Sequence, residues 1–113
     1  MTKVTIQDQL LTIIPHMYQA DNTTAIFFET EYGEEFGVLT TCIPDANTTL
    51  EDDEIIVKLY SENRIFFELL EGEVFEETYK MAFLGANMFN IWKINDTKLL
   101  EEIKKLKSVE MAS

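Results

Sequence analysis

The sequence predicts one α+β domain over residues 1–113, built mostly from short antiparallel strands. Apolar and polar residues alternate in short runs along the first half of the chain, as they do in strands with one buried face. Two later segments instead repeat their apolar residues with helical spacing. Short connections favour antiparallel neighbours. We therefore expect a twisted sheet of five or six strands, in the order β-β-β-β-α-β-β-α, with one central and one C-terminal helix.

Four strands are predicted before the first helix, over residues 10–18, 24–32, 35–43 and 54–60. Pro15 lies within the first of them and suggests an edge strand or a bulge. Gly33, between Tyr32 and Glu34, provides the turn of a hairpin. Residues 45–53 are polar and are expected to form a loop.

Ser61 is predicted to cap a helix of about ten residues. Gly72 is expected to adopt the left-handed conformation that ends it. Two further strands follow, over residues 74–83 and 88–94, with a turn between them. The segment Asn95-Asp96-Thr97 then caps a terminal helix with a stripe of apolar residues, namely Leu99, Leu100, Ile103 and Leu106. Whether this helix, over residues 96–113, packs on its own domain or is an appendage to it stays open.

The composition favours a cytoplasmic protein. Cys42 is the only cysteine, so no disulfide can form within the chain. The N-terminus has no long apolar run and does not resemble a signal peptide. The apolar runs are far shorter than the roughly 20 residues of a membrane helix, so we expect no membrane insertion.

The charge is strongly negative and unevenly distributed. The chain has 21 acidic and 9 basic residues, a net charge of −12. No lysine or arginine occurs between Val4 and Val57, although that stretch holds eleven acidic residues. Direct binding of nucleic acid is not expected, because such proteins carry a basic surface. Nine of these residues are the predicted partner-binding acidic face: Glu29, Glu31, Glu34, Glu35, Asp45, Glu51, Asp52, Asp53 and Glu54.

Two interpretations of this acidity remain open. Carboxylates spaced along strands and loops can imitate nucleic-acid phosphates and so occupy the basic groove of a nucleic-acid enzyme. The protein would then be a non-enzymatic binding module for a basic protein, and one such role is that of an inhibitor of a host or defence enzyme. Alternatively, the negative charge only maintains solubility.

The segment Tyr60-Ser61-Glu62-Asn63-Arg64 combines an aromatic ring, a hydroxyl, an amide and a guanidinium at the predicted start of a helix. Helix capping and packing of Tyr60 account for such a segment without any further function. We keep the five residues as a candidate recognition motif.

Three segments resemble a small family of uncharacterised proteins from Gram-positive phages and integrative mobile elements. They are residues 32–36, residues 39–44 and the more specific run from Val57 to Asn63, which contains Tyr60-Ser61-Glu62-Asn63. The resemblance implies an α+β fold and a mobile-element origin, and it implies no activity. The chain departs from the family at Arg64 and Ile65, where the family has an acidic residue and a glycine. It also has Cys42 where the family often has asparagine.

No constellation in the sequence predicts an enzyme, a cofactor or a metal. The loop ligands Asp45, Asn47 and Thr49 alternate as in a calcium site, but Leu50 occupies the position that requires glycine. His16 and Cys42 are too few for a zinc site, and Cys42 lies in an apolar strand, where thiols are usually inert. A structural protein that forms a homodimer is the alternative function, through a sheet edge or through the stripe of Leu99, Ile103 and Leu106.

Overall fold

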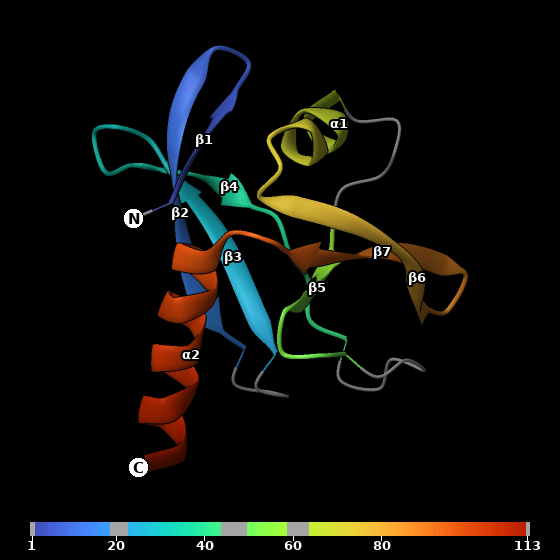
Figure 1. The fold of residues 1–113 in the computed structure, drawn as a ribbon. Coiled ribbons are helices and arrows are strands. Elements are labelled where there is room, and N and C mark those ends of the chain that lie inside the picture. The colour runs from blue at the N-terminus through green and yellow to red at the C-terminus, as the bar shows by residue number, and fades with distance from the viewer. Residues whose placement is uncertain (1, 19–22, 44–49, 59–63, 113) are drawn as a thin grey trace.

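The computed structural model describes residues 2–18, 23–43, 50–58 and 64–112. Within these residues, seven strands form two antiparallel sheets, and two helices pack against them (Figure 1). The predicted α+β class and the order of the helices among the strands are confirmed. The structure differs from the prediction in having two sheets, where one was expected, and in one additional strand at the N-terminus.

The larger sheet has the strand order β1-β2-β3-β4. Its strands are β1 (Lys3–Ile6), β2 (Gln9–Met17), β3 (Thr24–Glu29) and β4 (Glu35–Val38). Strand β1 was not predicted, because its turn contains no glycine. Gln7 and Asp8 form this turn with φ angles of 50° and 64°, the positive values of a two-residue type I′ hairpin. Because β1 pairs only with Gln9–Thr12, the proline at position 15 lies where β2 is locally an edge strand.

The smaller sheet has the strand order β5-β7-β6 and contains β5 (Glu54–Val57), β6 (Phe75–Leu84) and β7 (Asn87–Ile94). The predicted third strand was too long, because the chain leaves the first sheet after Val38 and crosses to the second. Thr40 stabilises the crossing: its hydroxyl accepts the Ile26 N–H at 3.1 Å, and its backbone bridges to Val57.

Helix α1 (Arg64–Glu71) follows β5, and its predicted cap, Ser61, lies outside the described residues. The prediction that Gly72 is the left-handed residue at its end was wrong. Glu73 holds that conformation, with φ of 63°. The Gly72 N–H donates to the Glu68 carbonyl at 3.3 Å, so the helical path continues through the glycine before it turns.

Helix α2 (Thr97–Ala112) begins at the predicted cap, where the Asp96 carboxylate accepts the Leu99 N–H at 2.9 Å. Leu99 and Ile103 are buried in the main core. The predicted apolar stripe therefore packs against the helix's own domain, which leaves these two side chains unavailable for a dimer interface.

The main core lies between the two sheets and the helices, around Trp92. Its ring is fully buried and packs edge-on against Phe66 at a centroid distance of 4.9 Å, with Phe75 at 5.7 Å. A smaller apolar cluster covers the other face of the second sheet, around Ile56 and Ile91. Of the helices in the described part of the chain, none has the length and apolar character needed to cross a membrane.

Candidate binding surface

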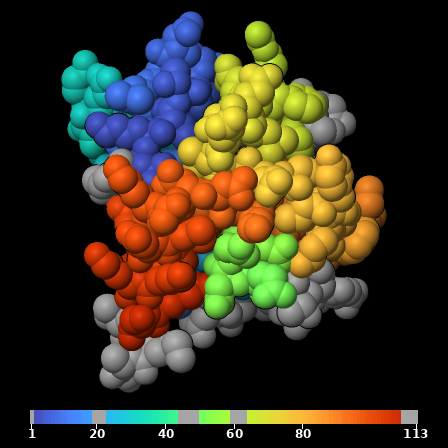
Figure 2. All heavy atoms as spheres, in the orientation of Figure 1, coloured from blue at the N-terminus to red at the C-terminus, as the bar shows by residue number. Residues whose placement is uncertain are grey.

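The predicted acidic residues do not form one continuous face. The structure divides them between the turns of the larger sheet and the start of β5. In Figure 2, the β3–β4 turn (teal) lies beside the β1–β2 hairpin (blue) at one corner of the molecule. The segment that leads into β5 (green) lies apart from it, between α2 and β6. The two groups have different electrostatic surroundings, because lysines of the same chain lie beside only one of them.

The first group gathers where two hairpins end side by side. Glu31 lines one shallow hollow together with Asp8 and Tyr32, and it lines a second hollow together with Glu29. Glu29 lies directly across the strand pair from Glu35, next to a bulge in β4 in which Phe36 is the extra residue. The local turn is rigid: the Thr30 hydroxyl accepts the N–H groups of residues 32 and 34, each at 3.3 Å. Glu31 and Glu34 are thus held close to both neighbouring strands.

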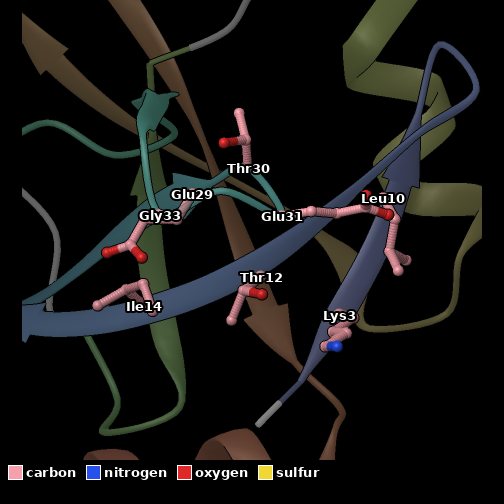
Figure 3. A pocket seen from close by; sticks show the side chains of 8 residues that line it. All are labelled: Lys3, Leu10, Thr12, Ile14, Glu29, Thr30, Glu31 and Gly33. Atoms are coloured by element: carbon pink, nitrogen blue, oxygen red, sulfur yellow. The ribbon is translucent and has the colours of Figure 1, made fainter.

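The second hollow, of about 320 Å³, lies on the outer face of the larger sheet (Figure 3). A cross-strand row runs through it from Lys3 to Thr12 and on to Glu29. The same row continues to Glu35 on β4. In Figure 3, Thr12 lies between Lys3 and Glu29, and Glu31 extends towards Leu10. Lys3 is the only basic residue that lines this hollow.

The carboxylates of this group make no ion pair among the described residues. Like charges directly opposite each other in a sheet destabilise it, so the pair of Glu29 and Glu35 has an energetic cost within the monomer. A cationic group from another molecule would relieve that repulsion. This is the physical reason to regard the group as a candidate binding surface.

Exposed apolar side chains accompany these acids. Tyr32 is 87% exposed in the β3–β4 turn, and Leu10 and Phe36 are also exposed. Aromatic residues contribute strongly to protein interfaces. We call the combined set the acidic hairpin surface: Asp8, Leu10, Glu29, Glu31, Tyr32, Glu34, Glu35 and Phe36.

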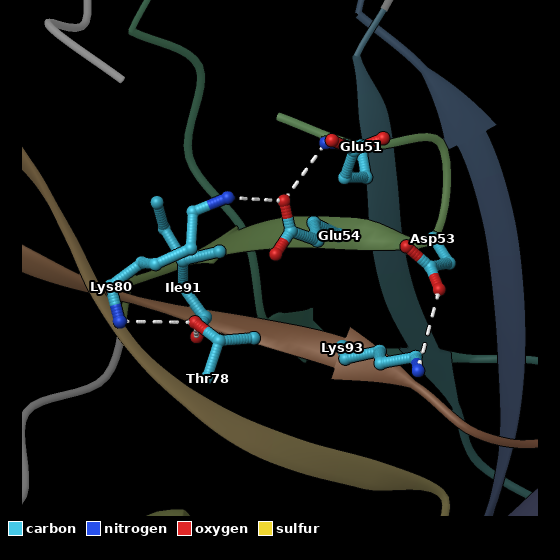
Figure 4. A network of polar contacts seen from close by, with 7 residues as sticks. All are labelled: Glu51, Asp53, Glu54, Thr78, Lys80, Ile91 and Lys93. Atoms are coloured by element: carbon cyan, nitrogen blue, oxygen red, sulfur yellow. Dashed lines mark hydrogen bonds and ion pairs between the residues drawn. The ribbon is translucent and has the colours of Figure 1, made fainter. Parts of the chain in front are cut away.

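The second group of acids consists of Glu51, Asp52, Asp53 and Glu54, and three of the four lie beside a lysine of the same chain. Lys107 of α2 lies 3.4 Å from the Asp52 carboxylate, and Lys93 of β7 lies 4.0 Å from that of Asp53. Glu54 is 7% exposed. Its carboxylate accepts from the Lys80 ammonium at 2.7 Å and from the Glu51 N–H at 2.8 Å (Figure 4). Three lysines from distant parts of the sequence therefore balance three of these four acids.

Other predicted residues have simpler outcomes. Asp45 and four residues of the candidate motif, Tyr60, Ser61, Glu62 and Asn63, lie outside the described residues. Arg64 is exposed at the first residue of α1. His16 packs edge-on against Phe27 on the outer face of the larger sheet, at 5.3 Å between ring centroids. No group of three acidic, histidine or cysteine residues in the described ranges has the arrangement of a metal site.

Sequence reasoning missed Asp8 and the apolar members of this surface. The alternation of Val4 and Ile6 with Leu11 and Ile13, on either side of Gln7-Asp8, was the signal for the missing hairpin. Comparison with protein-family models, with curated proteins and with solved structures yields no match to this chain. The proposals below therefore rest on the geometry and charge of the molecule.

Proposed function

We propose that this protein is a non-enzymatic binding module that holds a basic protein on its acidic hairpin surface. The observation that carries the proposal is the contrast between the two groups of acids. Around β5 the carboxylates meet lysines of the same chain, whereas those of the two hairpins make no ion pair among the described residues. A charged surface of one sign also accelerates encounter with a partner of the opposite sign.

The partner class that we propose is a protein whose basic groove normally holds nucleic acid. Glutamates on neighbouring strands can take the place of phosphates in such a groove, while Tyr32 and Phe36 add apolar contact area. The resemblance of residues 57–63 to proteins of phages and mobile elements suggests a setting for such an inhibitor. The corresponding site of action would be the cytoplasm of a bacterial host.

The first experiment is capture of partners from a host lysate with the tagged protein, at low and at high salt. We expect a basic nucleic-acid enzyme to be retained at about 0.05 M salt and lost at about 0.5 M, because salt screens exposed charges. Duplex DNA should displace that enzyme in competition. Retention that is unaffected by salt would contradict the proposal.

The decisive variant is the double substitution Glu31→Lys and Glu34→Lys. It should weaken binding of the captured partner about tenfold or more, equivalent to about 1.4 kcal/mol. The control variant, Glu71→Lys with Glu101→Lys, changes the net charge equally at exposed positions of the two helices. If both variants lose the same affinity, only net charge matters and the acidic hairpin surface is not the site.

A further inference from the structure

The tip of the β6–β7 hairpin is an uncharged, apolar projection from an acidic molecule. Residues 81–92 include no charged residue, although 27% of the chain is charged. Four large hydrophobic side chains of this hairpin are exposed: Tyr79, Phe83, Leu84 and Met88. Exposed apolar groups gathered in this way mark an interaction site more often than isolated ones do.

Strand β6 also has a free edge in the described part of the chain. It pairs with β7 on one side, and the sheet order β5-β7-β6 places no strand on the other. Figure 1 shows the tip of the hairpin projecting away from α2 and from the larger sheet. Backbone N–H and C=O groups that point outwards from such an edge can be satisfied by another strand.

The turn determines which backbone groups face that edge. Leu84 pairs with Asn87, so Gly85 and Ala86 form a two-residue loop, with φ of 60° at the glycine. Residues that flank such a loop exchange their hydrogen bonds with each other, and the pattern alternates along the strand. Leu84 and Ala82 thus direct their backbone groups to β7, whereas Met81 and Phe83 direct theirs outwards.

We infer that β6 is a self-association surface, on which a second copy of this chain adds its own β6 in antiparallel orientation about a two-fold axis at Ala82. In this register, Met81 lies opposite Phe83 of the partner subunit. The outward N–H and C=O groups of these two residues form four hydrogen bonds across the axis. The two smaller sheets then become one continuous sheet of six strands.

Side chains suit this register. Phe83 lies across from Met88 on β7 and on the same face of the sheet as Met81. The pairing places the phenylalanine of each copy between methionines, and sulfur–aromatic contacts of this kind are favourable. Tyr79, in the bulge beyond the paired residues, then lies near the turn of the partner subunit that contains Gly85. Open space surrounds the position of a Cβ at this glycine, so it leaves room for the tyrosine ring.

Tyr79 has a strained conformation that its neighbours enforce. Its φ is 65° and its side chain is 88% exposed, a combination that burial cannot explain. It lies in a bulge where the Thr78 hydroxyl donates to the Ile91 carbonyl at 2.7 Å and accepts the Lys80 N–H at 3.1 Å. The Glu77 carboxylate accepts the Tyr79 N–H and the Trp92 indole N–H. Strain fixed in this way is typical of functional positions.

The charge of the molecule favours a second copy as the occupant. A basic partner gains nothing from an uncharged hairpin, and it would bind the acidic hairpin surface instead. Two copies, each with a net charge of −12, bring no acidic side chains together where residues 81–92 meet. Since their other surfaces still repel, the dimer should be weak at low salt and stronger when salt screens the repulsion.

The test is the mass of the intact protein in solution, measured by light scattering and sedimentation from about 10 μM to about 1 mM, the range of weak interfaces. The mass should rise from 13.1 kDa to twice that value with concentration, and more readily at about 0.5 M than at about 0.05 M salt. Binding of a basic protein to the acidic hairpin surface should instead weaken as salt rises. The two proposals can therefore fail separately. A monomer at every concentration and salt would overturn the inference.

Variants test the register. Phe83→Lys should raise the dimer dissociation constant about tenfold or more, whereas Phe67→Lys, an equal charge change at an exposed residue of α1, should leave it unchanged. Met81→Pro removes an outward N–H that makes no hydrogen bond to β7. It should raise the dimer dissociation constant, as Phe83→Lys does.

A cross-linking experiment does not depend on affinity. In a Cys42→Ser background, chains with Met81→Cys should form disulfides with chains carrying Phe83→Cys, since opposed residues lie within reach of a disulfide. Neither variant should form them efficiently alone. Equal cross-linking in all combinations, or a dimer insensitive to both Phe83→Lys and Met81→Pro, would overturn the register.

Discussion

At the scale of single residues, the backbone makes unusual use of the left-handed region. Gln7, Asp8, Glu73 and Tyr79 all have positive φ, although none is glycine. At the end of α1 the left-handed residue is Glu73, and the glycine lies one position before it, at Gly72. Local geometry, and not the most permissive residue, decides where the chain turns.

Replacing Glu73 with glycine should therefore stabilise the protein by about 0.5–1 kcal/mol, because glycine adopts positive φ without a steric cost. The side chain is exposed, so no packing is lost. Thermal unfolding should show a melting temperature a few degrees higher than that of the wild type.

Neighbouring positions provide the controls for Glu73→Gly. Glu71→Gly, within α1, should lower the melting temperature. Gly72→Ala should not lower it, because an added Cβ would lie 3.6 Å from the nearest atom, the Leu69 carbonyl oxygen. A lower melting temperature for Glu73→Gly would contradict the left-handed assignment.

At the scale of elements, Asp96 joins the first strand to the last helix. Its carboxylate caps α2 through the Leu99 N–H and accepts the Thr2 hydroxyl at 2.7 Å. The hydrogen bond from Thr2 is the main cause that lowers the pKa of Asp96 below its usual 3.8. The Leu99 N–H adds to this lowering of the pKa, and desolvation opposes it.

Because folding lowers this pKa, the stabilisation is fully present above the usual pKa and is lost as pH falls through the folded value. Thr2→Val should lower the free energy of unfolding by about 1–2 kcal/mol at pH 7. The difference between the two proteins should start to shrink near the usual pKa of 3.8, where the Asp96 carboxyl of the unfolded chain takes up a proton, and should be lost below the lower pKa of the folded protein. Urea unfolding of the wild type and Thr2→Val at pH 7 and pH 3 measures this difference in the free energy of unfolding. An equal difference at both pH values would show that the Thr2 hydrogen bond does not depend on the charge of Asp96.

At the scale of the whole molecule, charge is separated by the fold. Lysines from β6, β7 and α2 reach the acids around β5, while the hairpin acids remain without such partners in the described structure. The monomer therefore carries an unrelieved concentration of negative charge at one corner. It also carries an uncharged, apolar tip on the β6–β7 hairpin, over residues 81–92.

Salt should accordingly stabilise the monomer, by about 1 kcal/mol or less between about 0.05 M and 0.5 M, because it screens repulsion among the hairpin acids. Salt should raise the free energy of unfolding of the Glu31→Lys, Glu34→Lys variant by less than that of the wild type. The Glu71→Lys, Glu101→Lys control should gain nearly as much as the wild type. Thermal unfolding of the three proteins, in samples too dilute to dimerise, measures these differences. An identical stabilisation of all three by salt would argue that the repulsion does not arise at the hairpins.

The sequence allowed much of the local structure to be predicted, because local rules determine it. The strand around Ile26 and Phe28, the turn at Gly33, the cap at Asp96 and the buried stripe of Leu99 and Ile103 all follow from periodicity and turn chemistry. The β1–β2 hairpin escaped prediction because Gln7 and Asp8 adopt a turn that usually contains glycine.

What the sequence determined by itself was the class of fold, the order of the helices and the negative charge of the first half, since each depends on composition or on neighbours along the chain. The tertiary structure alone decided which acids lie beside lysines of the same chain. Asp52, Asp53 and Glu54 look no different in the sequence from Glu31, Glu34 and Glu35. Folding brings lysines that are 26 to 55 positions away in the sequence to within 4.0 Å of Asp52, Asp53 and Glu54. The strength of an ion pair depends on distance in space, which the order of residues along the chain does not give.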